Sequence, residues 1–163
     1  MATPFGTEFD VYNATIAFIQ DRGGEIVCAS PPSGTDTRFK VCIFPKLGPQ
    51  KGPRDELDVS ATTPGYLLLV EAKPALSDSL SRLNRAGESD WDKLQRLLSI
   101  DEEYFLRRMS QAYGRTLTGL HRLPCLAFHR YDATLPATVT GIHVMSSTDV
   151  SLVGEVPDNV WPT

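Results

Sequence analysis

Two carboxylates and one ammonium group fall within a short stretch of this chain. Asp58 stands 13 residues before Glu71, and Lys73 follows Glu71 with one residue between them. Carboxylate oxygens are ligands that Mg²⁺ prefers, and a lysine beside a bound metal can orient a water molecule or stabilise developing charge. Charged groups buried without a partner are costly. These residue types therefore indicate either a metal-binding hydrolytic centre or an ordinary cross-strand ion pair between Lys73 and Asp58.

The segment that carries these residues predicts a β-hairpin. Residues 62–65, Thr-Thr-Pro-Gly, form a turn signal, because proline presets φ and glycine accepts a positive φ. After the turn, the apolar run 66–70 leads straight into Glu71, as expected for a buried strand. Side chains alternate between the two faces of a strand, so Glu71 and Lys73 share a face. The hairpin is expected to bring Asp58 beside Glu71.

An amphipathic helix is expected upstream of the hairpin. A Thr-Pro pair at 3–4 suits the start of a helix, and a Gly-Gly pair at 23–24 suits its end. Apolar residues recur at helical spacing between the two pairs. Glu8 lies near the edge of that apolar stripe and can lean into a cleft at the edge of the core. Asp10 lies farther round the helix and should face water.

The rest of the chain alternates strand and helix patterns. Strands are indicated by β-rich runs between Gly and Pro, and helices by apolar residues at helical spacing behind a capping residue. In chain order, the other expected elements are strands at 25–29 and 38–44, a basic loop rich in Pro and Gly at 45–54, an irregular or partly helical link at 75–88, a helix capped by Ser89 or Asp90, a second helix from a capping box at 99–102 to about Tyr113, and strands at 123–129 and 138–145.

The composition is that of an ordinary globular protein. With 163 residues, of which 41% are hydrophobic and 22% charged, the chain is expected to form one domain over residues 1–163. No apolar run is long enough to cross a membrane, and the N-terminus lacks the pattern of a signal peptide. The three cysteines are widely spaced and suggest neither a disulfide framework nor a zinc site. Free thiols fit a reducing compartment, so we expect an intracellular protein, cytoplasmic or nuclear.

The charge distribution is uneven. The net charge of −4 gives no global sign of nucleic-acid binding. Residues 104–130, however, hold five arginines and no acidic residue. Such a segment is the electrostatic footprint of a polyanion site, and it is equally the composition of a solvated helix face paired with the acids at 101–103. The basic loop 45–54 leaves the same choice open, between a contact to phosphates and plain surface.

In the order helix, strands, Asp58, Glu71-x-Lys73, helix and strand, the chain resembles the PD-(D/E)XK nuclease superfamily. The resemblance covers roughly residues 5–130 and rests on these three residues in their context. One departure is Leu57, which stands where the motif has the proline that names it. The resemblance implies an α/β fold, with a central mixed β-sheet flanked by helices and the αβββαβ core of restriction-endonuclease-like proteins.

The resemblance also implies an activity and its residues. The protein would be an endonuclease, dependent on Mg²⁺ or Mn²⁺, that cleaves phosphodiester bonds in nucleic acid. DNA is favoured over RNA as the substrate, and the sequence leaves that choice open. Asp58, Glu71 and the backbone carbonyl of Ala72 would bind the metal, and Lys73 would position the attacking water. Glu8 resembles the helical acid that many members add to the catalytic site.

Contacts to nucleic acid are expected from two helices. Lys93 and Gln95, on the helix after the motif, lie where the family often places a polar residue that touches the substrate. Arg107 and Arg108 belong to the basic segment and are expected to contact phosphates.

Two classes of function remain open. The first is the metal-dependent nuclease, which the joint presence of Asp58, Glu71 and Lys73 favours. The second is a catalytically degenerate module of the same fold that binds nucleic acid or a protein without cleaving. The acidic net charge favours this second class, because a nuclease usually offers phosphates a more positive surface. A homodimer that places two 104–130 segments together would supply that surface.

Overall fold

The computed structural model describes residues 7–34, 36–43, 56–144, 150–153 and 160–162. The expected basic loop at 45–54 and the Thr-Pro pair at 3–4 lie outside these residues. No helix within the described ranges is long and apolar enough to cross a membrane.

The centre of the protein is one mixed sheet whose strand order follows the chain. The first three strands form an antiparallel meander, the third to fifth run parallel, and the last is antiparallel. In order across the sheet, the strands are β1 (Glu25–Ala29), β2 (Val59–Thr63), β3 (Tyr66–Ala72), β4 (His121–Phe128), β5 (Thr140–Val144) and β6 (Val150–Val153).

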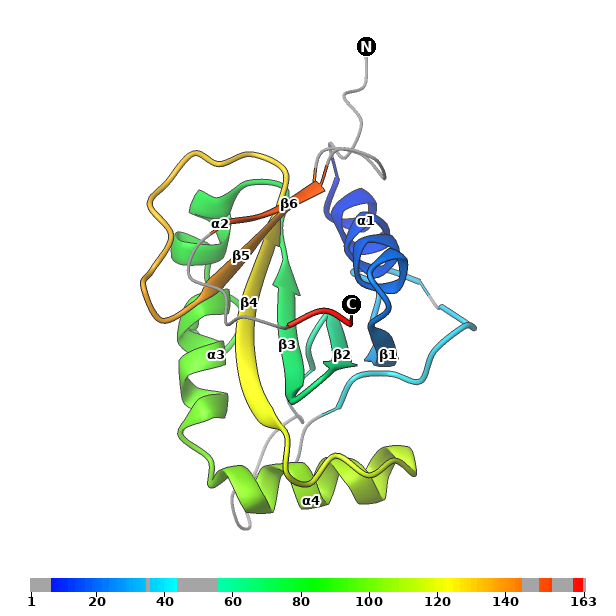
Figure 1. Ribbon diagram of the computed structural model, residues 1–163. Helices are drawn as coiled ribbons and strands as arrows, with labels where there is room; N and C mark the ends of the chain where they lie inside the picture. The colour runs from blue at the N-terminus through cyan, green and yellow to red at the C-terminus, as the bar shows by residue number, and fades with distance from the viewer. Residues whose placement is uncertain (1–6, 35, 44–55, 145–149, 154–159, 163) are drawn as a thin grey trace.

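Helices cover both faces of this sheet (Figure 1). One face is packed by α1 (Glu8–Asp21), and the other by the helices of the β3–β4 connection. These are α2 (Leu76–Ser81), α3 (Asp90–Leu98) and α4 (Glu102–Tyr113). The prediction of an α/β fold with a mixed sheet flanked by helices is therefore confirmed.

Strand β3 lies between the two cores, and its alternation supplies both. Leu68, Val70 and Ala72 pack into the core beneath α1. Leu67 and Leu69 pack into the core beneath α3 and α4. A strand buried on both faces reads as a continuous apolar run, which is why this stretch lacks polar alternation.

The helix starts agree in part with the sequence expectation. Helix α1 is described from Glu8, where Thr7 forms a capping box with Asp10. Ser89 caps α3 as expected, with its hydroxyl accepting from the Asp92 N–H at 3.1 Å. Helix α4 is capped by Asp101, two residues beyond the start of the expected capping box.

The predicted strand at 38–44 is wrong for the residues that are described. Over 36–43 the chain forms no strand and makes only an isolated bridge between Ile43 and Glu56. Single hydrogen bonds still hold the segment beside β1 and β2, from the Ala29 N–H to the Lys40 carbonyl and from the Leu57 N–H to the Cys42 carbonyl. Without a continuous ladder, the β propensity of this segment does not make it a strand.

The expectation that the cysteines form no disulfide is also wrong. Cys28, on β1, and Cys42 are joined by a disulfide, with their Cα atoms 4.8 Å apart. Cys125 is a free, buried thiol. Sequence spacing could not reveal the pair, because the two residues meet only when the 36–43 segment folds back along β1.

Candidate functional site

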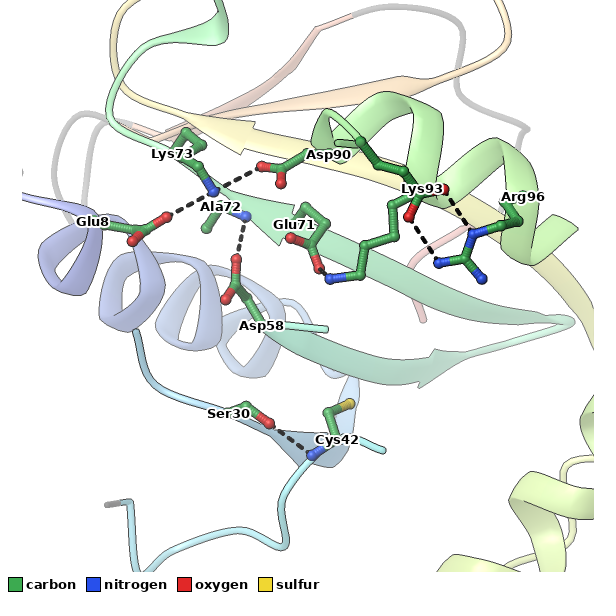
Figure 2. Close-up of polar contacts among 11 residues, drawn as sticks. Glu8, Ser30, Cys42, Asp58, Glu71, Ala72, Lys73, Asp90, Lys93 and Arg96 are labelled. Carbon is green, nitrogen blue, oxygen red and sulfur yellow. Dashed lines mark hydrogen bonds and ion pairs between the residues drawn. The ribbon is translucent and has the colours of Figure 1, made fainter. Parts of the chain in front are cut away.

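The site is built around the end of β3, opposite the residue that enters β2. The antiparallel register pairs Val59 with Val70, so one further step places Asp58 opposite Glu71 on the same face. The Asp58 Oδ2 atom accepts a hydrogen bond of 2.7 Å from the Ala72 N–H (Figure 2). This bond fixes the carboxylate of Asp58 against the last residue of β3.

Glu71 is a buried carboxylate with a cationic partner. Its side chain belongs to a residue that is only 4% exposed, and its Oε1 atom lies 3.3 Å from the Lys93 Nζ atom on α3. Burial raises the pKa of Glu71 well above its ordinary value, and the nearby carboxylates of Asp58 and Asp90 raise it further. The charge of Lys93 acts in the opposite direction.

Asp58 has a pKa that lies close to neutrality. Burial is the main cause that raises the pKa of Asp58 to about 7, and the charges of Asp90 and Glu8 add to it. The hydrogen bond from Ala72 and the charge of Lys73 lower this pKa in part. Asp58 and Glu71 are therefore carboxyl groups that resist ionisation.

Lys73 is held between two helices. Its Nζ atom lies 2.8 Å from Glu8 Oε1, on α1, and 3.0 Å from Asp90 Oδ2, on α3 (Figure 2). Burial alone would lower the pKa of Lys73, but Asp90, Asp58 and the bonded Glu8 raise it above its ordinary value. The side chain is thus an ammonium group held in place by one carboxylate from each face of the sheet.

Asp90 was missed as a site residue by sequence reasoning. The only signal at this position was its place at the start of a helix, which explains the residue as a cap and gives it no further role. The structure brings the first turn of α3 to the end of β3, where Asp90 meets Lys73. Four carboxylates and two ammonium groups gather there: Glu8, Asp58, Glu71, Asp90, Lys73 and Lys93.

The expected nucleic-acid contacts are dispersed. Lys93 belongs to the cluster, but its ammonium group points to Glu71. Gln95 contacts the Thr138 hydroxyl at 3.4 Å. Arg107 and Arg108 are exposed on α4, at the opposite end of the sheet from the tip of β3 (Figure 1). The structure does not bring Gln95, Arg107 or Arg108 to the carboxylates.

A pocket opens beside Lys73. Its volume is about 220 Å³, and its lining residues are Glu8, Lys73, Arg82, Leu83, Asn84 and Asp90. The buried side of the cluster therefore holds the carboxylates of Asp58 and Glu71, and the open side holds Lys73 with its two partners.

The donor set fits a hard divalent cation of the Mg²⁺ type. Such a cation is bound by one or two carboxylates and keeps several waters. Asp58 and Glu71 supply two carboxylates, and Ala72 directs its carbonyl to the same edge of β3 as its N–H, which faces Asp58. Burial and, to a lesser degree, the neighbouring carboxylates raise the pKa of both carboxyl groups, and a bound cation would favour their charged forms. Within the described ranges there is no group of three or more His, Cys, Asp or Glu side chains arranged around one metal.

No protein-family model, curated protein or solved structure matches this chain. The fold and the site geometry therefore carry the functional argument. They define an α/β protein with a partly buried, acid-rich polar cluster where a β-hairpin ends.

Proposed function

We propose that this protein is a Mg²⁺- or Mn²⁺-dependent endonuclease that hydrolyses phosphodiester bonds in nucleic acid, with DNA as the expected substrate. The observation that supports this most is the side-by-side placement of Asp58 and Glu71, with Ala72 and Lys73 next to them at the end of β3. The order α1, three antiparallel strands, helices and a parallel β4 agrees with the αβββαβ core of the PD-(D/E)XK superfamily.

The roles of the residues follow from their contacts. Asp58, Glu71 and the Ala72 carbonyl would hold the cation, which when bound polarises a phosphate and lowers the pKa of a water molecule. Lys73 stands at the pocket with its ammonium group fixed by Glu8 and Asp90, where it orients the attacking water or stabilises negative charge on the phosphate.

A second candidate is the catalytically degenerate module, and one observation favours it. The charged groups already satisfy one another: Lys93 pairs with Glu71, and Glu8 and Asp90 both pair with Lys73. A closed set of ion pairs can hold helices to a sheet without any chemistry. In such a module, nucleic acid or protein would bind without being cleaved.

Metal-dependent cleavage separates the two candidates. A labelled DNA duplex and an RNA of the same sequence are incubated with the protein and Mg²⁺ or Mn²⁺, and the products are resolved on a denaturing gel. We expect cleavage that EDTA stops, and a decrease of at least about 100-fold in rate for Asp58→Asn and for Lys73→Ala, because each removes a group at the reacting phosphate.

The matched control is Lys40→Ala, which removes an exposed lysine outside the cluster and should leave the rate unchanged. Circular dichroism checks that each variant is folded. A folded wild-type protein that cleaves neither substrate with either metal would favour the degenerate module. Cleavage that survives EDTA or Lys73→Ala would assign the activity to another site.

The homodimer and the intracellular location are also proposals. Sedimentation equilibrium would report the doubled mass of a homodimer. The disulfide removes one argument for a reducing compartment, because only Cys125 is a free thiol. Imaging of the tagged protein tests its location.

A further inference from the structure

Two arginines lie on the loop that joins α2 to α3, at the same end of the sheet as the site. Residues 82–87 contain Arg82 and Arg85 and no acidic residue. Arg82 lines the pocket that also holds Lys73, and both arginines are exposed. The arginines of α4 lie at the other end of the sheet (Figure 1). Among these arginines, Arg82 lines the pocket beside Lys73, and Arg85 follows three residues later on the same loop.

The positive charges of this loop are available to a ligand. The nearest acid in sequence, Glu88, is bound through both of its oxygens to Arg96, at 2.7 and 3.0 Å. Glu8 and Asp90, which share the pocket with Arg82, are paired with Lys73. Among the described residues, no carboxylate forms an ion pair with Arg82 or Arg85.

The loop is held in one conformation by its own hydrogen bonds. Asn84 Oδ1 accepts from the N–H groups of Ala86 and Glu88, at 2.9 and 3.0 Å. The Asn84 N–H donates to the Glu88 carbonyl at 2.9 Å, and the Gly87 N–H donates to the Asn84 carbonyl at 3.0 Å. A loop ordered in this way loses little conformational entropy when a ligand binds.

An exposed apolar side chain stands beside Arg82. Leu83 is 61% exposed, and it lines the same pocket as Lys73. A solvent-exposed leucine between two arginines suits a strand that presents both phosphates and the apolar faces of its sugars and bases.

We propose that residues 82–87 form a nucleic-acid-binding rim of the site. In this rim, Arg82 and Arg85 contact phosphates next to the scissile one, and Leu83 packs against a sugar or base of the same strand. The proposal rests on the proposed function, and it gives that function a substrate contact that Arg107 and Arg108 are too far away to make.

Salt-dependent binding tests the rim separately from cleavage. Affinity is measured by fluorescence anisotropy over a series of salt concentrations, with a fluorescein-labelled DNA hairpin that carries a single-stranded tail. Ca²⁺ replaces Mg²⁺ in these measurements, so that binding is measured separately from cleavage. Ca²⁺ also takes oxygen ligands, but in a looser geometry than Mg²⁺. Removing one phosphate-binding side chain should reduce the slope of log affinity against log salt by about one unit.

We expect Arg82→Ala/Arg85→Ala to weaken binding at least about tenfold and to reduce the slope by about two units. Leu83→Ala should weaken binding about threefold or more and leave the slope unchanged, because an apolar contact releases no counterions. The matched control, Arg107→Ala/Arg108→Ala, removes the same charge at the other end of the sheet and should leave affinity and slope close to the wild-type values.

The outcomes separate this inference from the proposed function. An unchanged slope for Arg82→Ala/Arg85→Ala, with wild-type cleavage that Asp58→Asn abolishes, overturns the rim and leaves the nuclease in place. A reduced slope in a protein that never cleaves supports the rim and overturns the nuclease. Equal effects of the two arginine pairs would also overturn the rim, because binding would then depend on total charge alone.

Discussion

At the scale of single residues, the site is governed by the cost of burying like charges together. Asp58 and Glu71 face each other across the hairpin, and Asp90 adds a third carboxylate whose charge raises the pKa of both. The two lysines offset part of this repulsion through their pairs with Glu8, Asp90 and Glu71. The ionisation of such a cluster of buried carboxylates depends strongly on pH and on nearby cations.

The pKa of Asp58 predicts a pH dependence of stability. Its carboxyl has a pKa of about 7 in the folded protein, against an ordinary value of 3.8 that applies to the unfolded chain. Between these values the folded state holds a proton that the unfolded state has released, so the free energy of unfolding falls as pH rises. We expect the melting temperature without metal to fall between pH of about 4 and about 7, and Asp58→Asn to flatten the fall.

Glu71, whose pKa is also raised, acts in the same direction as Asp58. His129, whose pKa burial lowers, opposes it. The comparison with Asp58→Asn separates Asp58 from His129. Because the charge of Asp58 also raises the pKa of Glu71, the variant reports on the two carboxyl groups together. Mg²⁺ should raise the melting temperature more at a pH of about 7.5 than at about 5, since a metal ligand must be deprotonated. Identical pH profiles for the wild type and the variant would contradict this assignment.

At the scale of elements, Asp58 depends on a segment that is not itself regular structure. The Ser30 N–H donates to the Asp58 carbonyl at 2.8 Å, and the Cys42 N–H donates to the Ser30 hydroxyl at 2.8 Å (Figure 2). Cys42 is in turn tied to β1 through Cys28. The disulfide therefore holds the backbone that leads into the site.

Reducing this disulfide should destabilise the protein. The two cysteines are 14 residues apart in sequence, and closing a loop of about this size is worth roughly 3 kcal/mol. We expect dithiothreitol to lower the free energy of unfolding of the wild type by about that amount, as measured with urea. The variant Cys28→Ser/Cys42→Ser should start at the lower stability and show no response to dithiothreitol. An equal response of both proteins would mean that the reductant acts elsewhere.

At the scale of the whole molecule, residues near the two ends of the chain pack together on the α1 side. The ring of Trp161 meets the ring of Phe18 edge to face, with centroids 5.5 Å apart, and Val160, the residue before Trp161, is buried. Pro162 lies against the position where Gly23 would carry a Cβ atom. These contacts hold residues 160–162 against α1, the helix that supplies Glu8.

Trp161 should therefore contribute to global stability through its ring. Its indole N–H is buried without a hydrogen-bond partner among the described residues, so the ring and not the N–H carries the contact. We expect Trp161→Ala to lower the free energy of unfolding by about 2 kcal/mol, and Trp161→Phe to change it little. Urea denaturation measures both. Equal decreases for the two variants would contradict a contribution from the ring.

The sequence alone was sufficient for most of the elements and for the core of the candidate site. Apolar periodicity and turn residues are local properties, and they predicted α1, the β2–β3 hairpin, α3, α4 and β4 within a few residues. The Asp58 and Glu71 pair follows from the same local information, because a tight turn sets the register of a hairpin. The helical wheel likewise placed Glu8 at the edge of the core, where it meets Lys73.

The tertiary structure decided which distant groups meet. Asp90 reaches Lys73 because the long connection between the parallel strands β3 and β4 carries α3 back over the sheet. Cys28 meets Cys42 because residues 36–43 fold along β1. Arg82 lies at the same end of the sheet as the site, and Arg107 lies at the other end, because α2 and α4 occupy opposite ends of the sheet. Contacts of this kind depend on the path of the whole chain, which a local pattern of residue types does not encode.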